Sequence, residues 1–556
     1  RAQLPDFVSA AVSLSAMRNP VLLILGAALA ISAAAGTATE AGAQDDSARD
    51  RAWSNYFAAR TPKRAEKAAR SLAGMGIGFD EAWDRLRTGR SYPVEVETGL
   101  VWKSHRVDGF LHQYVFLIPA DYDPANRYPV TVYLHGTVLR SAPEPRERWW
   151  LMGLQADEGE ILVVPAAWKS STWWMASQSE NIAEILDDLK RSYNIDENRV
   201  VLMGVSDGGT GTFFQAFRNT TPWASFLPFI GNPEVLGNPK NAVDGDMFPV
   251  NLSNKPMFVV NGARDHRYPT WIVLPYLQLL ADAGARIVFR QQAESGHDQR
   301  WWSSETENIS SFIATHPRDP LPDRLVWETE RADRYNRAHW LVIEQLGSVP
   351  GESDVPDYNT VVVPPTLPPL GIVPGEDSTR LTVREVRPRS LAAGSGFQAG
   401  DIIVDADGVP ISDLASLGRV LADTEWGSTV VFGIARDGEE MQLEVQYPPK
   451  PDTDPLRQAF PRSGPSGRVE VERQGNTVVA STRGVRVFRL LLSPDEFDLS
   501  EPIRIEVNGT TVFEEPVAPS TEALLTWAAR DNDRSMLFAA EIVVDVATGQ
   551  CRVTQP

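Results

Sequence analysis

The chain has 556 residues, of which 42% are hydrophobic and 23% charged, with a formal net charge of −20. This composition is that of folded globular protein, and the length suggests about three domains. The acidic balance argues against a nucleic-acid-binding protein, because contact with phosphates needs a net basic face. A single cysteine, Cys551, excludes an intramolecular disulfide.

The N-terminal region is predicted to carry an export signal. Arg18 supplies a basic start, residues 21–35 are almost wholly apolar, and small residues at 41–43 offer a cleavage site. We therefore expect residues 17–43 to be a signal peptide, preceded at 1–16 by translated sequence upstream of the true start. The mature protein is then expected to be periplasmic or extracellular, without a stable membrane span. A retained anchor is the alternative, although a spanning helix needs about 20 apolar residues.

The next part of the chain predicts an α/β domain. Residues 44–95, rich in Ala, Arg, Glu and Lys, indicate a polar helical lead-in. From 96 to 318, apolar strand-like runs alternate with amphipathic helical segments, the pattern of a mostly parallel sheet covered on both faces. The expected strands are 114–118, 130–134, 161–164, 199–204, 257–261 and 286–290, and the expected helices are 181–193, 210–217 and 271–281.

One segment places a serine between a buried strand and a helix. The strand 199–204 runs into Gly204-Val205-Ser206-Asp207-Gly208, and the helix 210–217 follows. A serine hydroxyl is a weak nucleophile, so it must be exposed at a sharp turn where a base can reach it. Glycines two positions to either side relieve the crowding of such a turn. The pentapeptide alone is a weak signal, but with its flanking elements it predicts Ser206 as a nucleophile.

With these features, residues 100–315 resemble the α/β-hydrolase superfamily. The resemblance is to secreted bacterial esterases of the poly(3-hydroxybutyrate)-depolymerase, feruloyl-esterase and prolyl-oligopeptidase-like group. It implies a doubly wound, mostly parallel α/β-hydrolase sheet and the chain order serine, acid, histidine. After the strand 257–261 it places the acid at Asp265, and after the strand 286–290 it places the base at His297.

Other histidines and aspartates compete for these roles. His297 is the one histidine in the expected loop after a strand; the others are His105, His112, His135, His266, His316 and His339. Asp244, Asp246 and Asp298 remain alternatives to Asp265, although a side chain adjacent to His297 points away from it.

The resemblance also implies an oxyanion hole built from two backbone N–H groups. One belongs to Asp207, directly after the nucleophile, and the other to Thr137, in the loop after the strand 130–134. Trp173, Trp174 and Trp301 are candidates for an apolar substrate pocket, with packing over the sheet as an equal alternative. No metal or organic cofactor is expected, because the histidines show no ligand-spaced cluster.

Residues 361–449 resemble a bacterial-type PDZ domain. The likeness lies in the run from Ser390 to Ile403, which includes Gly396-Phe397-Gln398-Ala399-Gly400-Asp401. It implies a peptide groove beside the helix 414–422 and a loop, Leu370, Gly371 and Ile372, that captures the C-terminal carboxylate of a protein or peptide partner. Pro369 replaces the usual extra glycine before this loop, so a purely structural PDZ fold stays an alternative.

The remaining sequence predicts a Pro-rich linker at 450–466 and a β-rich accessory domain at 467–556. Asn508-Gly509 marks a hairpin turn in that domain, and a helix is expected at 521–529. The connector 319–360 contains strand-like runs that could pair with strands after residue 467. The PDZ segment would then be an insertion.

The sequence thus predicts an exported serine hydrolase that cleaves carboxylic esters through an acyl-enzyme intermediate. A serine peptidase of prolyl-oligopeptidase type, using the same residues, is the first alternative. A non-catalytic PDZ-containing binding protein is the second.

Overall fold

The computed structural model describes residues 39–151, 159–362, 365, 367–375, 380–452 and 455–553. The chain divides into two compact units, Arg1–Thr360 with Gln458–Pro556, and Val361–Arg457. The predicted segments 1–16 and 17–43 lie outside the described residues, except that positions 39–43 begin helix α1 (Thr39–Ala58). In the described part of the chain, no helix has the length and apolar content to span a membrane.

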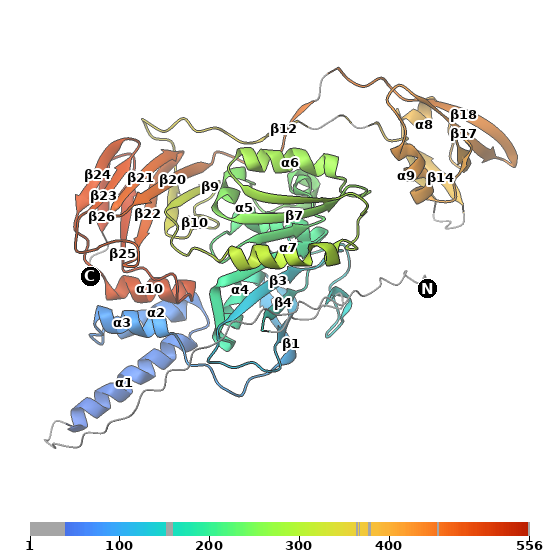
Figure 1. Cartoon of the computed structure of the whole chain (residues 1–556). Coiled ribbons are helices and arrows are strands. Elements are labelled where there is room, and N and C mark those ends of the chain that lie inside the picture. The colour runs from blue at the N-terminus through green and yellow to red at the C-terminus, as the bar shows by residue number, and fades with distance from the viewer. Residues whose placement is uncertain are drawn as a thin grey trace. The chain divides into compact units, whose positions relative to one another are not determined.

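The first unit is built around an eight-stranded sheet with the order β1-β2-β4-β3-β5-β6-β7-β8 (Figure 1). The pairs from β4 across to β8 are parallel, and β1 and β2 are antiparallel additions at one edge. This is a mostly parallel α/β-hydrolase sheet, as predicted. The strands are β1 Gly99–Val107, β2 Phe110–Ile118, β3 Tyr128–Leu134, β4 Ile161–Pro165, β5 Ile195–Val205, β6 Phe226–Phe229, β7 Pro256–Gly262 and β8 Arg286–Gln292.

All six strands predicted for this sheet are confirmed, whereas β1 and β6 were not predicted. β1 is an edge strand whose central residues are polar and half-exposed, so it lacks an apolar run. β6 has only four residues and includes Pro228, and a proline argues against a central strand in a sequence pattern.

Helices cover both faces of the sheet. The helices α4 (Ala176–Ser192), α5 (Asp207–Arg218) and α6 (Thr270–Asp282) confirm the predicted ones, and α7 (Trp302–Thr315) is an addition. Ile309 and Phe312 of α7 pack with Phe258 and Val260 of β7, while α6 lies across the opposite face (Figure 1). Residues 208–218 of α5 are all buried, as expected for a helix enclosed by its neighbours.

The C-terminal part of this unit is a sandwich of two five-stranded sheets, β10-β11-β22-β25-β26 and β24-β23-β21-β20-β9. Because β9 pairs with β20 and β11 with β22, strands from before and after the second unit share one core. The second unit is therefore an insertion into the sandwich. The strands are β9 Arg324–Thr329, β10 Arg337–Ala338, β11 Leu341–Leu346, β20 Gly467–Gln474, β21 Thr477–Arg483, β22 Val485–Leu492, β23 Ile503–Val507, β24 Thr510–Glu515, β25 Ala540–Asp545 and β26 Gln550–Val553.

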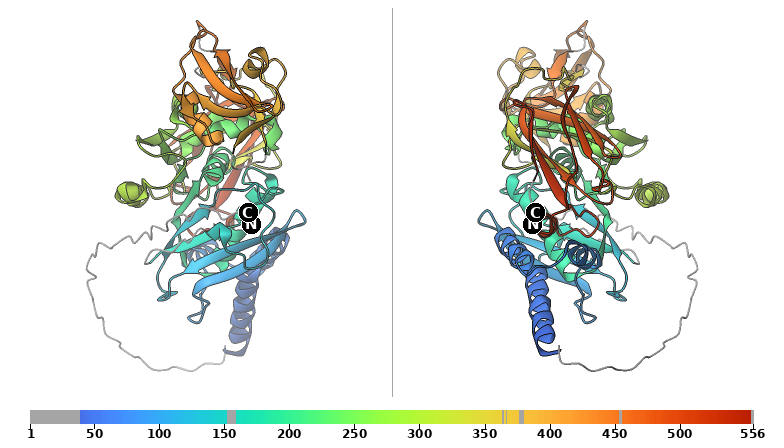
Figure 2. Two further views of the ribbon diagram at one scale, coloured as in Figure 1. Left: turned by 90° about the vertical axis from the view of Figure 1, so that its right-hand side faces the viewer. Right: turned by 90° about the vertical axis from the view of Figure 1, so that its left-hand side faces the viewer.

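The N-terminal helices pack on the single helix of the sandwich. Leu72 of α2 (Pro62–Ala73) and Leu86 of α3 (Phe79–Thr88) share a core with Leu524 and Leu525 of α10 (Thr521–Asp531). The blue helices consequently lie beside the red C-terminal segment in Figure 1. Figure 2 shows α1 extending away from the rest of the unit.

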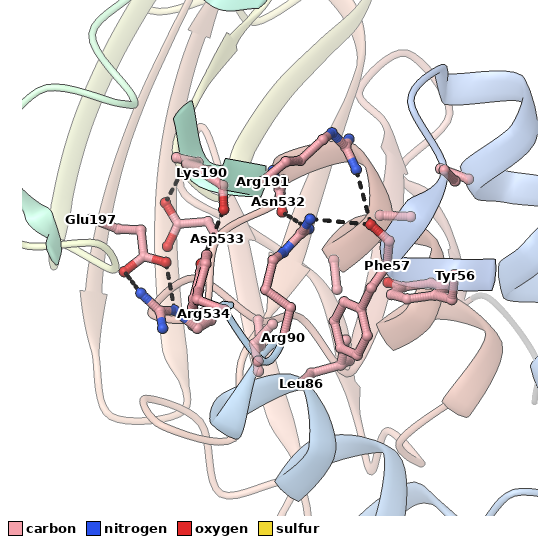
Figure 3. A pocket seen from close by; sticks show the side chains of 17 residues that line it. Tyr56, Phe57, Leu86, Arg90, Lys190, Arg191, Glu197, Asn532, Asp533 and Arg534 are labelled. Carbon is pink, nitrogen blue, oxygen red and sulfur yellow. Dashed lines mark hydrogen bonds and ion pairs between the residues drawn. The ribbon is translucent and has the colours of Figure 1, made fainter. Parts of the chain in front are cut away.

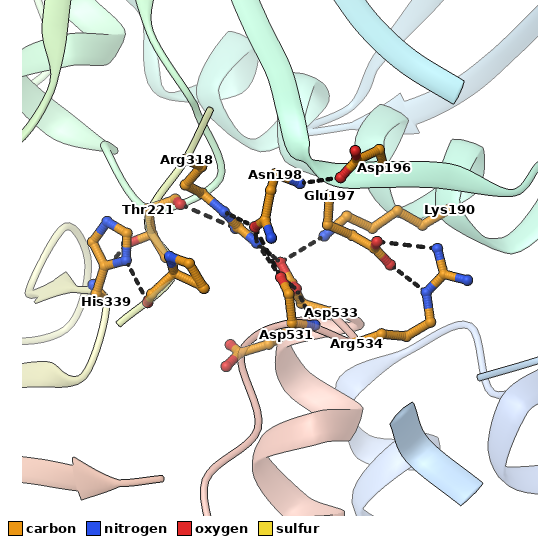
Figure 4. Close-up of polar contacts among 12 residues, drawn as sticks. Lys190, Asp196, Glu197, Asn198, Thr221, Arg318, His339, Asp531, Asp533 and Arg534 are labelled. Carbon is orange, nitrogen blue, oxygen red and sulfur yellow. Dashed lines mark hydrogen bonds and ion pairs between the residues drawn. The ribbon is translucent and has the colours of Figure 1, made fainter. Parts of the chain in front are cut away.

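A buried polar network joins the sheet domain to the sandwich (Figure 4). Oδ2 of Asp533 forms an ion pair with Arg318 at 2.8 Å and lies 3.6 Å from Nζ of Lys190. Next to it, Arg534 pairs with Glu197 at 2.7 Å. Burial alone would raise the pKa of Asp533, but Arg318 and Lys190 together hold that pKa below its ordinary value. The carboxylate is therefore ionised inside the protein.

The second unit is built on a small antiparallel sheet, β13-β14-β15-β17-β18, with β16 paired to β15. Helix α9 (Leu414–Ala422) coincides with the helix predicted beside the peptide groove, and α8 (Leu391–Gly394) precedes it. At the two ends of the unit, β12 (Thr360–Val362) pairs with β19 (Leu456–Gln458). The sheet strands are β13 Ile372–Pro374, β14 Leu381–Val386, β15 Ile402–Ala406, β16 Val409–Pro410, β17 Thr429–Arg436 and β18 Glu439–Gln446.

Candidate active site

Ser206 occupies the sharp turn between β5 and α5. Its backbone has φ 58° and ψ −118°, which a residue with a side chain adopts only when its surroundings enforce it. The Ser206 N–H donates to the carbonyl of Phe229 at 2.9 Å, which fixes the turn against β6. A Cβ at Gly204 would collide with the carbonyl of Gly208, so the flanking glycines permit the close approach of strand and helix.

Three side chains converge at the carboxyl ends of the parallel strands β5, β7 and β8. The Ser206 hydroxyl lies 2.8 Å from Nε2 of His297, and Nδ1 of His297 lies 2.8 Å from Oδ2 of Asp265. Asp265 follows β7 and His297 follows β8, the last two strands of the sheet. The side chain of Asp265 is fully buried, and that of His297 is 13% exposed.

The second oxygen of Asp265 is held by the backbone of its own loop. Oδ1 accepts the N–H of Arg267 at 2.7 Å and that of Tyr268 at 2.9 Å. Burial alone would raise the pKa of Asp265, but the hydrogen bond from His297 and these amides outweigh it and leave the pKa below its usual value. The carboxylate is ionised and fixed in orientation, as needed to stabilise a neighbouring imidazolium.

Backbone hydrogen bonds tie the acid loop to the histidine loop. Ala263 N–H donates to the Gln292 carbonyl at 2.9 Å, and Arg264 N–H donates to the Ser295 carbonyl at 3.0 Å. At the surface, Arg264 and Glu294 form an ion pair at 2.8 Å. The separation of Asp265 and His297 is consequently set by the sheet rather than by mobile loops.

The loop after β3 lies directly against the serine turn. A Cβ added at Gly136 would lie 3.1 Å from Cβ of Ser206, and Thr137 follows with φ 63°. The carboxylate of Asp207 accepts the N–H of Val138 at 3.0 Å, so this loop is joined to the first turn of α5. The amides of Thr137 and Asp207 therefore belong to two segments that meet beside Ser206.

His135 fixes this loop. Its ring is fully buried; Nδ1 lies 2.7 Å from the Gly136 carbonyl, and Nε2 accepts the N–H of Ala167 at 3.0 Å. Because Nε2 accepts, Nδ1 must carry the proton that is donated to Gly136. Burial lowers the pKa of His135 to about 4, so the ring is neutral at ordinary pH.

The three tryptophans predicted for a pocket are packed in the interior, with at most 5% of their surface exposed. The indole N–H of Trp173 donates to the His135 carbonyl, and that of Trp301 donates to the Asp298 carbonyl. Trp174 donates in the same way to Asn241. Trp173 thus supports the loop that contains Thr137, and Trp301 supports the loop of His297. Their part in binding substrate stays a prediction.

The competing residues have other partners. Asp244 binds Arg334 and Tyr335, Asp246 accepts the N–H of Ser463, and Asp298 pairs with Arg300. His266 is exposed, with its ring 6.2 Å from that of His297. Among the residues that the structure describes, His, Cys, Asp and Glu side chains form no group of three that could hold a metal ion.

Tyr268 was not predicted and belongs to the immediate surroundings of His297. Its ring packs edge-on against the imidazole, with the centroids 5.5 Å apart and the planes at 74°. The only signal in the sequence is its place three residues after Asp265 and before Pro269, which does not by itself indicate a contact with His297.

A small cavity of about 40 Å³ lies elsewhere in the first unit, between the end of α3, α4 and α10 (Figure 3). Its charged lining is already matched, because Arg90 donates to Asn532 at 2.7 Å and Arg534 pairs with Glu197. This volume accommodates no more than a few water molecules. We interpret the cavity as a packing gap between helices and not as a ligand-binding site.

In the second unit, the predicted carboxylate loop is tightly held. The Leu370 carbonyl accepts the N–H of Ala392 at 2.9 Å, and the Gly371 carbonyl accepts that of Arg387 at 2.8 Å. Gly371 has φ 88°, and a Cβ there would collide with Ser390. Ile372 begins the edge strand β13 and pairs with Val386. Whether this loop binds a carboxylate stays a prediction.

Comparison with known proteins identifies residues 368–447 as a match to the PDZ domain family. Over 128 residues the chain is 28% identical to the probable periplasmic serine endoprotease DegP-like of Bartonella henselae, a match covering 22% of this chain and 25% of that protein. Over 63 residues it is 41% identical to the periplasmic pH-dependent serine endoprotease DegQ of Escherichia coli, covering 11% and 14%. Over 139 residues it is 30% identical to the bifunctional acetylxylan esterase/xylanase XynS20E of Neocallimastix patriciarum, covering 24% and 20%. The matches span a quarter or less of these relatives' own lengths.

Similar solved structures include a thermostable esterase, at 18% identity and a TM-score of 0.32, covering 39% of this chain and 63% of that one. Another is the acylaminoacyl peptidase of Pyrococcus horikoshii, at 12% identity and a TM-score of 0.31, covering 40% and 42%. Scores this low carry no information on activity. The strand order and the family match together establish a chain that combines an α/β-hydrolase sheet with a PDZ domain.

Proposed function

We propose that this protein is a serine hydrolase that cleaves carboxylic esters, with Ser206 as nucleophile, His297 as general base and acid, and Asp265 as the orienting carboxylate. The observation that carries the proposal is the continuous hydrogen-bonded series Asp265–His297–Ser206, with 2.8 Å at both steps. Nucleophile and base within this distance, with the base oriented by a third group, are the signature of nucleophilic catalysis.

In the proposed mechanism, Nε2 of His297 takes the proton of the Ser206 hydroxyl as Oγ attacks the ester carbonyl. The negative charge that develops on the carbonyl oxygen is stabilised by the amides of Asp207 and Thr137. His297 then delivers the proton to the oxygen of the leaving alcohol as its bond to the carbonyl carbon breaks. The acyl group remains bound to Ser206. Water attacks this acyl-enzyme with His297 again as base, and the acid is released.

Ester rather than peptide cleavage is supported by the match to the acetylxylan esterase/xylanase XynS20E, a relative that is not an endoprotease. A peptidase using the same three residues is the second candidate, favoured by the matches to periplasmic endoproteases.

A direct test compares p-nitrophenyl esters of increasing acyl length with aminoacyl p-nitroanilides, using the purified full chain. The proposal expects ester turnover to exceed anilide turnover by orders of magnitude and to vanish in the Ser206→Ala variant. Faster cleavage of anilides would reject ester hydrolysis in favour of the peptidase.

We further propose that the protein works outside the cytoplasm and that its PDZ domain binds the C-terminus of a peptide or protein partner. The support is the predicted signal at 17–43 and the edge strand β13 next to the loop at Gly371, which can accept an added strand. Isothermal titration with a peptide of free C-terminus, and with its C-terminal amide as control, tests the second part. Equal affinity for both peptides would contradict carboxylate capture.

A further inference from the structure

The edge of the PDZ unit that would receive a partner is the strand β13, Ile372–Pro374. This strand stands at the end of the sheet order and pairs on one side only, with β14. Such an edge binds an extended chain through the backbone N–H and C=O groups that face outward. How far a partner can pair along β13 therefore depends on which of its residues face outward and on what each of them offers.

Ile372 faces outward. In an antiparallel pair of strands, opposed residues alternate between those that bond each other through the backbone and those whose N–H and C=O groups point away from each other. Ile372 lies opposite Val386. Beside this pair, the N–H of Arg387 donates to the Gly371 carbonyl at 2.8 Å, which makes the pair one of the second kind. The N–H and C=O of Ile372 are consequently both directed to the open side of the sheet.

Pro374 occupies the next outward position. It lies opposite Val383, and beside this pair the N–H of Gly375 donates to the Thr382 carbonyl at 2.8 Å. Val383 directs its own N–H to the Asp401 carbonyl at 2.7 Å, on the side of β14 away from β13. Pro374 thus directs its carbonyl to the open side, but a proline has no N–H to place next to it.

The outward edge of β13 is therefore uneven. Within the described stretch 370–375, Ile372 provides both a donor and an acceptor, whereas Pro374 provides an acceptor alone. With the terminal carboxylate at the loop of Gly371, a partner runs antiparallel to β13, so its last residue lies opposite Ile372 and its third-last residue opposite Pro374. The N–H of that third-last residue can reach the Pro374 carbonyl, but its carbonyl meets no donor.

The surroundings of the loop suit the end of a chain. Arg387, whose backbone is bonded to the loop, and Arg389 are both exposed, although the chain as a whole has a net charge of −20. Two guanidinium groups at this place attract a terminal carboxylate. Ile372 of the edge and Leu421 of α9 pack, partly buried, on the apolar core of the unit, so an apolar terminal side chain fits beside them.

We propose that the PDZ unit recognises its partner by the last three residues of a free C-terminus, and that Pro374 ends the backbone pairing there. This inference rests on the proposed binding of a C-terminus and specifies which part of the partner is read. Such a partner can carry any sequence further upstream. An extended segment from the interior of a chain has no carboxylate and needs a longer ladder of hydrogen bonds, so it is excluded.

The test measures the binding of two acetylated peptides with a free C-terminus, Val-Ala-Val and Gly-Ala-Gly-Val-Ala-Val, to the full chain by isothermal titration. For the wild type we expect dissociation constants within about threefold of each other, because the three added residues gain no strong backbone bond. Pro374→Val supplies an N–H opposite the third-last carbonyl, and both peptides should then bind about 3- to 10-fold more tightly.

Two controls isolate this hydrogen bond. In the first, a trans-alkene replaces the amide that follows the third-last residue, which removes the carbonyl in question, and this peptide should gain nothing from Pro374→Val. In the second, Pro388→Ala removes an exposed proline of the same unit outside β13 and should leave every affinity unchanged. Pro374→Ala supplies the same N–H with a smaller side chain and serves if Pro374→Val unfolds more easily in urea.

Three results would overturn the inference while leaving the binding of a C-terminus intact. They are a hexapeptide that binds the wild type more than about threefold more tightly than the tripeptide, equal affinities for the wild type and the Pro374 variants, and an alkene peptide that gains as much as the amide peptide. Failure of both free-carboxylate peptides to bind, or equal binding of their C-terminal amides, would contradict the proposed carboxylate capture itself and the inference with it.

Discussion

Asp265 and Asp533 are two buried carboxylates in one unit, with 0% and 2% of their side chains exposed. Burial would raise the pKa of both, and in both the partners reverse this effect. The partners differ, however. Asp533 faces Arg318, which keeps its proton under all conditions, whereas Asp265 faces His297, which can accept and release one. An ionised buried carboxylate is thus common to the structural network at Asp533 and to the proposed active site at Asp265, and the two sites differ in the partner and in that partner's access to solvent.

The largest expected effect follows removal of Ser206, the proposed nucleophile. Ser206→Ala should reduce kcat for p-nitrophenyl esters by about 10⁴- to 10⁶-fold, because no other group can form the acyl-enzyme. Steady-state kinetics measure the loss, and the midpoint of urea unfolding should stay within experimental error. Residual turnover within tenfold of wild type would mean that another residue is the nucleophile.

Asp265→Asn replaces the proposed orienting carboxylate by an amide of nearly the same size. The amide cannot stabilise the imidazolium and can favour the wrong tautomer of His297, so we expect kcat to fall about 10³- to 10⁴-fold. Stability should change little by comparison. A variant that keeps more than a tenth of wild-type kcat would reassign the acid, and Asp298→Asn is the control expected to remain active.

Asp533→Ala tests the other carboxylate. Removing it leaves Arg318 and Lys190 as buried charges without their acceptor, and we expect unfolding to become about 3–5 kcal/mol easier. Urea unfolding measures this change, while kcat per folded molecule should stay near that of wild type. A variant that is as stable as the wild type but inactive would contradict a purely structural role of Asp533.

The smallest expected effect is on the pH dependence of stability, and it concerns His112, a buried histidine in β2 of the eight-stranded sheet. Burial, with the neighbouring His105, lowers the pKa of His112 to about 4, against an ordinary value of 6.5. The unfolded chain therefore takes up a proton that the folded one refuses, so stability is fully present above pH 6.5 and is lost as the pH falls toward 4. We expect His112→Leu to reduce the slope of stability against pH in this range by at most about 1.4 kcal/mol per pH unit. Urea unfolding at pH 7, 5.5 and 4.5 gives the slope, and an unchanged slope would contradict burial as the cause.

Much of the sheet follows from patterns that the sequence carries locally. Each of the six predicted strands holds an apolar run; five of them lie inside the sheet, and β8 is its partly exposed edge. The serine turn combines strand, glycines and helix in one stretch. The same patterns do not predict β1 and β6. β1 is an edge strand with polar central residues, and β6 has only four residues and includes a proline. Their place depends on the partners on either side, which no single run of residues specifies.

The surroundings of the site were less predictable for a related reason. Asp265 and His297 could be proposed from a resemblance in chain order, but the contact of Tyr268 with His297 depends on the relative placement of two loops. Likewise, the sequence left a substrate pocket and packing over the sheet as equal alternatives for Trp173 and Trp301, and it did not show that their N–H groups bind carbonyls in the interior. Packing between segments that are distant in the sequence decides which side chains are buried.

In the proposed site, His297 activates the Ser206 hydroxyl and Asp265 orients His297. The most direct test of this activation is mass spectrometry of the intact protein after brief exposure to a fluorophosphonate, with the modified peptide mapped. We expect one adduct per chain, located at Ser206, formed rapidly in the wild type, slowly in Asp265→Asn and not at all in Ser206→Ala. An adduct at another residue, or a labelling rate in His297→Ala equal to that of the wild type, would contradict it.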